Sequence, residues 1–65
     1  MTQVEKSYLT KYFQNKVDNA IAENQKAGKA GNHKDAEYWC EILAYTEQIA
    51  FDLGIEVSED NAALY

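Results

Sequence analysis

The sequence predicts an all-α fold: two long helices in an antiparallel hairpin, followed by a short C-terminal tail, in a single domain over residues 1–65. Three observations predict it. The chain contains no proline, so no residue forces a break in a long helix. Its three glycines stand at two places, residues 28–31 and residue 54, where a turn and a helix end are expected. Apolar residues recur every three or four positions in the two long segments that these places delimit.

The first helix is predicted over about residues 3–27. Its apolar residues follow the i, i+4, i+8, i+11 spacing that gathers side chains on one helix face. They are Leu9, Phe13, Val17, Ala20 and Ile21, with Asn24 on the same stripe. A strand is excluded because its two-residue period would put Lys11 and Asn15 on the face of the apolar residues. A smaller apolar stripe points away from the first and consists of Val4, Tyr8 and Tyr12.

Residues 27–35 are interpreted as a joint between the helices and not as a chemical site. Either Gly28 or Gly31 ends the first helix, because glycine is the preferred residue just beyond a helix C-terminus. Asn32 is a favoured N-cap for the second helix, and Asp35 suits the first turn of that helix. The sequence therefore predicts a tight connection and two antiparallel neighbours.

The second helix is predicted over about residues 33–53, ending before Gly54, with Ile55 placed to make the apolar contact that often follows a helix end. Its apolar residues cover well over half of the circumference, and Glu47 is the one charge inside this arc. A helix that is apolar over so wide an arc needs more than one neighbour. The expected solution is a homodimer in which two hairpins form a four-helix bundle. The candidate residues of the shared interface are Trp39, Leu43, Ala50 and Phe51.

The tail after Gly54 leaves two alternatives open. In one, Ser58 caps a short helical turn that lays Ala62, Leu64 and Tyr65 against the hairpin. In the other, the tail is a solvated terminus without lasting contacts. Even a docked tail would leave part of the apolar arc of the second helix uncovered.

The charge of the chain is unevenly distributed. The net charge is −5, and residues 34–65 carry a single lysine, Lys34, against eight acidic residues. Binding to a phosphate backbone needs clustered Lys or Arg, so no direct nucleic-acid partner is expected. Carboxylates spaced along the second helix could instead imitate a phosphate backbone and occupy the cleft of a nucleic-acid-binding protein. The candidates for this alternative function, an acidic inhibitor, are Glu37, Glu41 and Asp52.

No residue pattern predicts an enzyme, a metal site or a cofactor. His33, Glu37 and Glu41 share a helix face, but paired metal sites in helical bundles use a Glu-x-x-His motif that this chain lacks. Cys40 lies on the apolar arc with no neighbouring base to activate its thiol, so it is interpreted as a buried small side chain. We therefore expect a non-enzymatic protein.

The expected location is the cytoplasm. The N-terminal residues lack the continuous apolar run of a signal peptide, and no segment approaches the roughly 20 apolar residues that span a bilayer. The single cysteine, Cys40, has no partner within the chain, which fits a reducing compartment. No membrane partner is expected.

Residues Gly31, Asn32 and His33, followed by Ala36 and Trp39, resemble the turn and second-helix opening of tetratricopeptide-type helical hairpins. The resemblance covers about ten residues, and the usual first-helix signature is missing at Lys11 and Tyr12. The whole chain resembles small, uncharacterised helical-hairpin proteins of Gram-positive bacteria and their phages. This second resemblance implies a phage or mobile-element origin and transfers no functional residue.

The predicted function is a small non-enzymatic protein-protein interaction module or regulator that binds a protein partner stoichiometrically. Aromatic side chains give contact area at low entropic cost and are enriched at interfaces. Two interpretations of the smaller stripe on the first helix remain open, since it either packs on the second half of a bundle or binds a heterologous partner. The residues concerned are Val4, Tyr8 and Tyr12.

Overall fold

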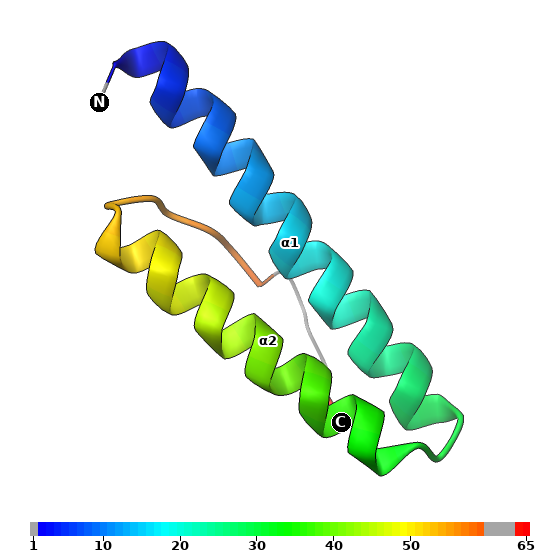
Figure 1. Cartoon of the computed structure of the whole chain (residues 1–65). Coiled ribbons are helices and arrows are strands. Elements are labelled where there is room, and N and C mark those ends of the chain that lie inside the picture. The colour runs from blue at the N-terminus through cyan, green and yellow to red at the C-terminus, as the bar shows by residue number, and fades with distance from the viewer. Residues whose placement is uncertain (1, 60–63) are drawn as a thin grey trace.

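A computed structural model of the chain describes residues 2–59 and 64–65. Two helices lie antiparallel in a hairpin, α1 over Gln3–Lys29 and α2 over His33–Asp52 (Figure 1). The predicted fold class is confirmed, and the predicted helix bounds agree with these to within two residues. In the part of the chain that is described, neither helix has the length and apolar content needed to cross a bilayer.

Gly31, and not Gly28, ends α1. Gly31 adopts a φ of 75°, a left-handed conformation that side chains disfavour. The main-chain N–H of Gly31 donates to the Gly28 carbonyl at 3.1 Å, and that of Asn32 donates to the Ala27 carbonyl at 2.8 Å. These two bonds form a Schellman motif, which satisfies the last carbonyls of the helix. The predicted N-cap of α2 is confirmed, because the Asn32 side chain accepts a hydrogen bond from the Asp35 main-chain N–H at 3.2 Å.

The same motif ends α2 at Gly54, which has a φ of 73°. The main-chain N–H of Ile55 donates to the Ala50 carbonyl at 2.8 Å, and that of Gly54 donates to the Phe51 carbonyl at 2.9 Å. The Ile55 side chain is buried against Phe13 and Ala50. The predicted apolar contact after the helix end is therefore confirmed, and it turns the chain back towards α1.

The core lies between the two helices and beneath the start of the tail. One cluster consists of Phe13, Ala50 and Ile55, with Leu9 and Val57 packed against it. The other consists of Val17, Ala20 and Leu43, with Ile21, Trp39, Ile42 and Val57 packed against it. Val57 contacts both clusters, so the tail forms part of the core.

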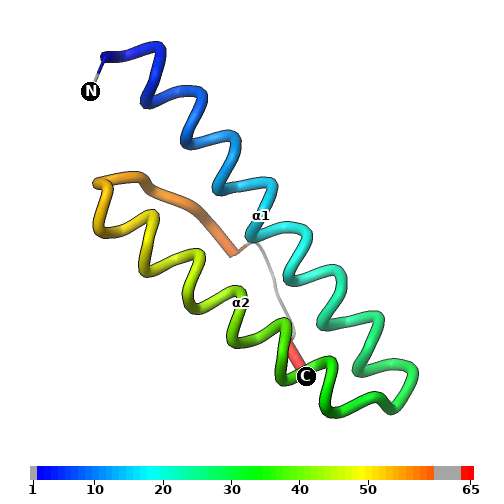
Figure 2. The backbone as a smooth tube through the Cα atoms, in the orientation of Figure 1, coloured from blue at the N-terminus to red at the C-terminus, as the bar shows by residue number. Residues whose placement is uncertain are grey.

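Residues 55–59 and 64–65 of the tail dock on the hairpin. After Gly54 the chain runs back between α1 and α2, and its last residues lie beside the helices (Figures 1 and 2). Of the two predicted alternatives, docking is the one observed for residues 55–59 and 64–65, and these residues contain no helical turn. Ala62, part of the predicted turn, lies outside the described residues. The tail thus supplies a third layer of contacts that two helices alone lack.

Candidate functional site

The structure corrects the predicted dimer interface on α2. Leu43 is 3% exposed and Ala50 is 0% exposed, so both pack inside the hairpin and offer no free surface. Trp39 is half-buried against the Leu43 cluster. Phe51 alone of the four predicted residues is largely free, with 78% of its surface exposed. The prediction fails for Leu43 and Ala50 because α1 and the tail already cover that sector of α2.

A second exposed apolar surface of α2 lies on another sector, which we call the α2 stripe. Its members follow a spacing of four, three and four residues, which places side chains along one helix face. They are Tyr38, Ile42, Tyr45 and Ile49. All but Ile42 are exposed, and Tyr45 is 68% exposed. The Tyr38 ring also meets Trp39 edge to face at a centroid distance of 5.2 Å, so the stripe continues onto a half-buried indole.

The predicted partner-binding residues Val4, Tyr8 and Tyr12 are all exposed on the N-terminal half of α1. The Tyr12 ring contacts Phe13 edge to face at 5.4 Å between centroids, and the Lys16 ammonium lies 5.5 Å from the Tyr12 ring centroid. These contacts hold the Tyr12 ring in place without covering it. We call these three residues the α1 patch, and in the single chain it is a free aromatic surface.

The predicted acidic residues Glu37, Glu41 and Asp52 are exposed along α2. Asp52 accepts a hydrogen bond from the Gln48 side-chain amide at 3.0 Å. Glu41 lies one helical turn from Tyr45, because residues four apart are neighbours on a helix surface. The acidic strip therefore borders the α2 stripe.

The described residues contain no group of three His, Cys, Asp or Glu side chains arranged to hold a metal ion. His33 is exposed at the start of α2. The Cys40 sulfur accepts a hydrogen bond from the Asn24 side-chain amide at 3.2 Å and lies 3.5 Å from the Tyr65 main-chain oxygen. Cys40 thus belongs to the surface on which the tail ends.

Gln14 binds the tail at Ser58, a contact that the sequence does not predict. The Gln14 side-chain N–H donates to the Ser58 carbonyl at 2.8 Å, and the Gln14 side-chain oxygen accepts from the Ser58 main-chain N–H at 3.0 Å. One amide thus pairs with both main-chain groups of one residue, as a neighbouring strand would. This recognition uses the backbone of Ser58 and ignores its side chain.

Asn24 binds the main chain of Tyr65 in the same way. The Asn24 side-chain oxygen accepts from the Tyr65 main-chain N–H at 2.9 Å. The Asn24 amide N–H group donates to the Tyr65 main-chain oxygen at 3.3 Å and to the Ala36 carbonyl at 2.8 Å. Asn24 is 0% exposed, so a buried amide joins α1, α2 and the tail. The groove between the helices that Gln14 and Asn24 line is called the tail groove below.

The Tyr65 ring packs closely against the backbone of Gly28. A Cβ atom built on Gly28 would overlap the Tyr65 ring and its Cβ atom. A glycine inside a helix destabilises it by roughly 0.5–1 kcal/mol relative to alanine. Close approach of an aromatic ring to the backbone accounts for a glycine at this position, three residues before the one that ends the helix.

We expect Gly28→Ala to lift Tyr65 from the hairpin, although this substitution normally stabilises a helix. The expected results are faster hydrogen exchange of the Tyr65 amide and no gain in thermal stability. In a Tyr65→Gly background both the ring and its Cβ atom are absent, so the same substitution should raise the free energy of unfolding by roughly 0.5–1 kcal/mol. Equal stabilisation in both backgrounds would show that Tyr65 does not pack closely against Gly28.

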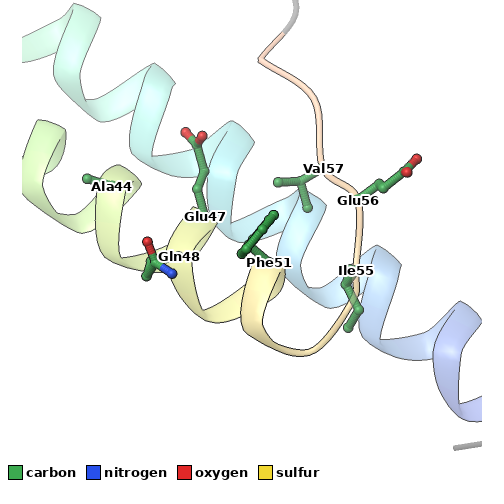
Figure 3. A pocket seen from close by; sticks show the side chains of 7 residues that line it. All are labelled: Ala44, Glu47, Gln48, Phe51, Ile55, Glu56 and Val57. Atoms are coloured by element: carbon green, nitrogen blue, oxygen red, sulfur yellow. The ribbon is translucent and has the colours of Figure 1, made fainter.

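An open hollow of about 610 Å³ lies beside the start of the tail (Figure 3). It is lined by Ala44, Glu47, Gln48, Phe51, Ile55, Glu56 and Val57. The exposed Phe51 ring stands at its centre, and the Glu56 carboxylate points outward. The Glu47 carboxyl forms a hydrogen bond with that of Glu59, which, together with burial and the charge of Glu59, raises the pKa of Glu47 to about 7. Two acidic side chains therefore meet where the tail passes over α2.

Together these features define a small all-α helical hairpin on which tail residues 55–59 and 64–65 dock, and whose second helix carries a largely exposed apolar stripe. No family model, curated protein or solved structure matches the chain. The functional argument therefore rests on the chemistry of these surfaces.

Proposed function

We propose that this protein is a small non-enzymatic interaction module that works in the cytoplasm as a homodimer and binds a protein partner stoichiometrically. The observation that carries the proposal is the α2 stripe, in which Tyr38, Tyr45 and Ile49 are exposed while Ile42 packs against the edge of the core. A regulatory role and a phage or mobile-element origin, which the resemblance of the sequence implies, belong to the same proposal. The lone thiol of Cys40 supports the cytoplasmic location.

The pattern of the α2 stripe supports a second copy as its occupant. The order of its residues is Tyr, Ile, Tyr, Ile. When two such helices pack antiparallel about a two-fold axis, Tyr38 lies opposite Ile49 of the second copy and Ile42 lies opposite Tyr45. Each ring then meets an aliphatic side chain, so the surface is complementary to itself, as a two-fold interface requires. The four-residue and three-residue spacing also suits the packing of helices in a four-helix bundle.

The dimer is expected to strengthen with salt. The acidic strip that borders the α2 stripe carries Glu37, Glu41 and Asp52, and antiparallel packing brings the strips of both copies to the edges of one interface. Like charges repel across such an interface, and salt screens them. An acidic inhibitor of a nucleic-acid-binding protein behaves in the opposite way, because its complex weakens with salt and with neutralisation of these three carboxylates.

The test is analytical ultracentrifugation of the wild-type chain and of Tyr45→Ser/Ile49→Ser over a range of concentrations. Loss of two apolar contacts in each copy should weaken the dimer by at least about tenfold, since a buried apolar side chain contributes about 1.5–3 kcal/mol. Val4→Ser/Tyr8→Ser, which removes the same kind of surface from the α1 patch, is the matched control and should leave the dimer intact. The proposal would be refuted if the wild-type chain stayed monomeric at several hundred micromolar. It would also be refuted if Tyr45→Ser/Ile49→Ser formed a dimer with the dissociation constant of the wild-type chain.

In the proposed dimer the α1 patch remains available for a heterologous partner. Its exposed residues, Val4, Tyr8 and Tyr12, combine aromatic area with the nearby Lys16 ammonium. Capture from the native host with the wild-type chain and with Val4→Ser/Tyr8→Ser tests this role. A partner retained equally by both forms would remove the patch from the proposal.

A further inference from the structure

The tail groove recognises the backbone of the tail at two residues, Ser58 and Tyr65. Gln14 and Asn24 each use one side-chain amide to donate to and accept from the main chain of a single tail residue, Ser58 and Tyr65 respectively. Such bonds give affinity to any extended segment, while side-chain seats give specificity, as when a strand is added to a sheet edge. Two side chains of the tail are recognised here. Val57 packs into the core, and the Tyr65 ring lies against Gly28, which has no side chain.

The groove is also built to be occupied. Asn24 is 0% exposed, and within the described residues its side-chain oxygen has one hydrogen-bond donor, the Tyr65 main-chain N–H. A buried acceptor without a partner destabilises a fold by about 1–3 kcal/mol. An extended backbone at this position therefore satisfies a requirement of the hairpin, whichever chain supplies it.

The resident tail fits the groove poorly at Glu59. The Glu59 carboxyl meets that of Glu47 on α2, and Glu47 also lines the hollow beside the start of the tail. On the α1 side, the Gln14 amide that holds Ser58 also donates to the Asp18 carboxylate at 3.0 Å. Glu59 therefore meets a like charge on α2. A basic side chain in place of Glu59 would meet an opposite charge at Glu47.

We propose that the tail groove is a docking site for an extended segment of a partner protein, and that the chain's own tail occupies this site until the partner displaces it. The partner segment carries a β-branched aliphatic residue in the position of Val57, a Lys or Arg in that of Glu59, and an aromatic residue in that of Tyr65. The positions are two and six residues apart, as in the tail. This site is separate from the α2 stripe.

The tether sets the concentration at which a competitor acts. A short flexible tether holds a segment at an effective concentration on the order of millimolar. A free peptide identical to the tail therefore displaces half of it only near that concentration. Replacing the carboxylate at position 59 by an ammonium group converts repulsion into attraction at a partly exposed site, which should lower the half-displacement concentration by roughly three- to tenfold.

The experiment uses the full chain, isotopically labelled for NMR, and two synthetic peptides at pH 7.5. One peptide has the sequence of residues 55–65, IEVSEDNAALY, and the other is the same peptide with Glu59→Lys. Displacement is read from the main-chain amides of Ser58 and Tyr65, which lose their bound positions. Occupation of the groove is read from the side-chain amides of Gln14 and Asn24. The Lys peptide is expected to act at the lower concentration, and in the Glu47→Gln chain its advantage should shrink.

Three results would overturn the proposal: no binding of the Lys peptide up to several millimolar, binding that leaves Ser58 and Tyr65 undisturbed, or no preference for the Lys peptide. In the third case exchange of tails between copies of this chain would be the better account of the groove. Repeating the titration on Tyr45→Ser/Ile49→Ser separates this proposal from the dimer. The groove should bind the Lys peptide equally well in that variant.

Discussion

We expect Asn24→Asp to lower the free energy of unfolding by about 3 kcal/mol at pH 7, because it leaves a buried charge without compensation. The two side chains have nearly the same shape, so packing is kept. What changes is the donor: the amide N–H group of Asn24 faces the Ala36 carbonyl, the Cys40 sulfur and the Tyr65 main-chain oxygen. A carboxylate there would face three acceptors and have no solvent, since Asn24 is 0% exposed.

Chemical denaturation followed by circular dichroism measures this loss. The loss should shrink towards pH 4, where the introduced carboxyl takes up a proton and can donate a hydrogen bond again. Asn19→Asp makes the same chemical change at an exposed position of α1 and should alter the free energy by no more than about 0.5 kcal/mol. A loss at Asn24 as small as that at Asn19 would show that this amide does not join the three segments.

The helices were predictable because the signals for them are local. The caps at Asn32 and Gly54 and the apolar spacing each involve residues a few positions apart. The main deviation is the end of α1, which was predicted at about residue 27 and lies at Lys29. Gly28 has the sequence signal of a helix end, but it is helical. Its backbone packs against the ring of Tyr65, which lies 37 positions later in the sequence.

The tail groove was not predictable because its bonds join residues 41 and 44 positions apart. A helical wheel gives the width of the apolar arc of α2 but not the sector that faces α1, so Leu43 and Ala50 were assigned to the wrong neighbour. Two signals did exist in the sequence. Asn24 is a polar residue on an apolar stripe, and Glu47 is a charge inside an apolar arc. Both side chains contact the tail. A polar residue on an otherwise apolar helix face is therefore a sign that a third segment packs against that face.

The stability of the chain is expected to fall as the pH rises from about 4.5 to about 7. The hydrogen bond that protonated Glu47 donates to Glu59, burial and the charge of Glu59 raise the pKa of Glu47 from 4.5 to about 7 in the folded state. The folded chain therefore holds a proton that the unfolded chain has released over this window, so folding is favoured at the acidic end. This contribution is complete below pH 4.5 and absent above pH 7. Solvent screens partly exposed carboxyls, so its size is about 1 kcal/mol.

Glu47→Gln should remove this dependence, because an uncharged amide next to Glu59 needs no proton. Relative to the wild-type chain, the variant is expected to be more stable by about 1 kcal/mol at pH 8 and nearly equal at pH 4.5. Glu59→Gln should act in the same way, since the proton is shared by the pair. Glu41→Gln, at an exposed position of the same helix, controls for the loss of one negative charge from an acidic chain. If Glu41→Gln stabilises the chain at pH 8 as much as Glu47→Gln does, the gain comes from net charge, and the contact between tail and α2 is not its source.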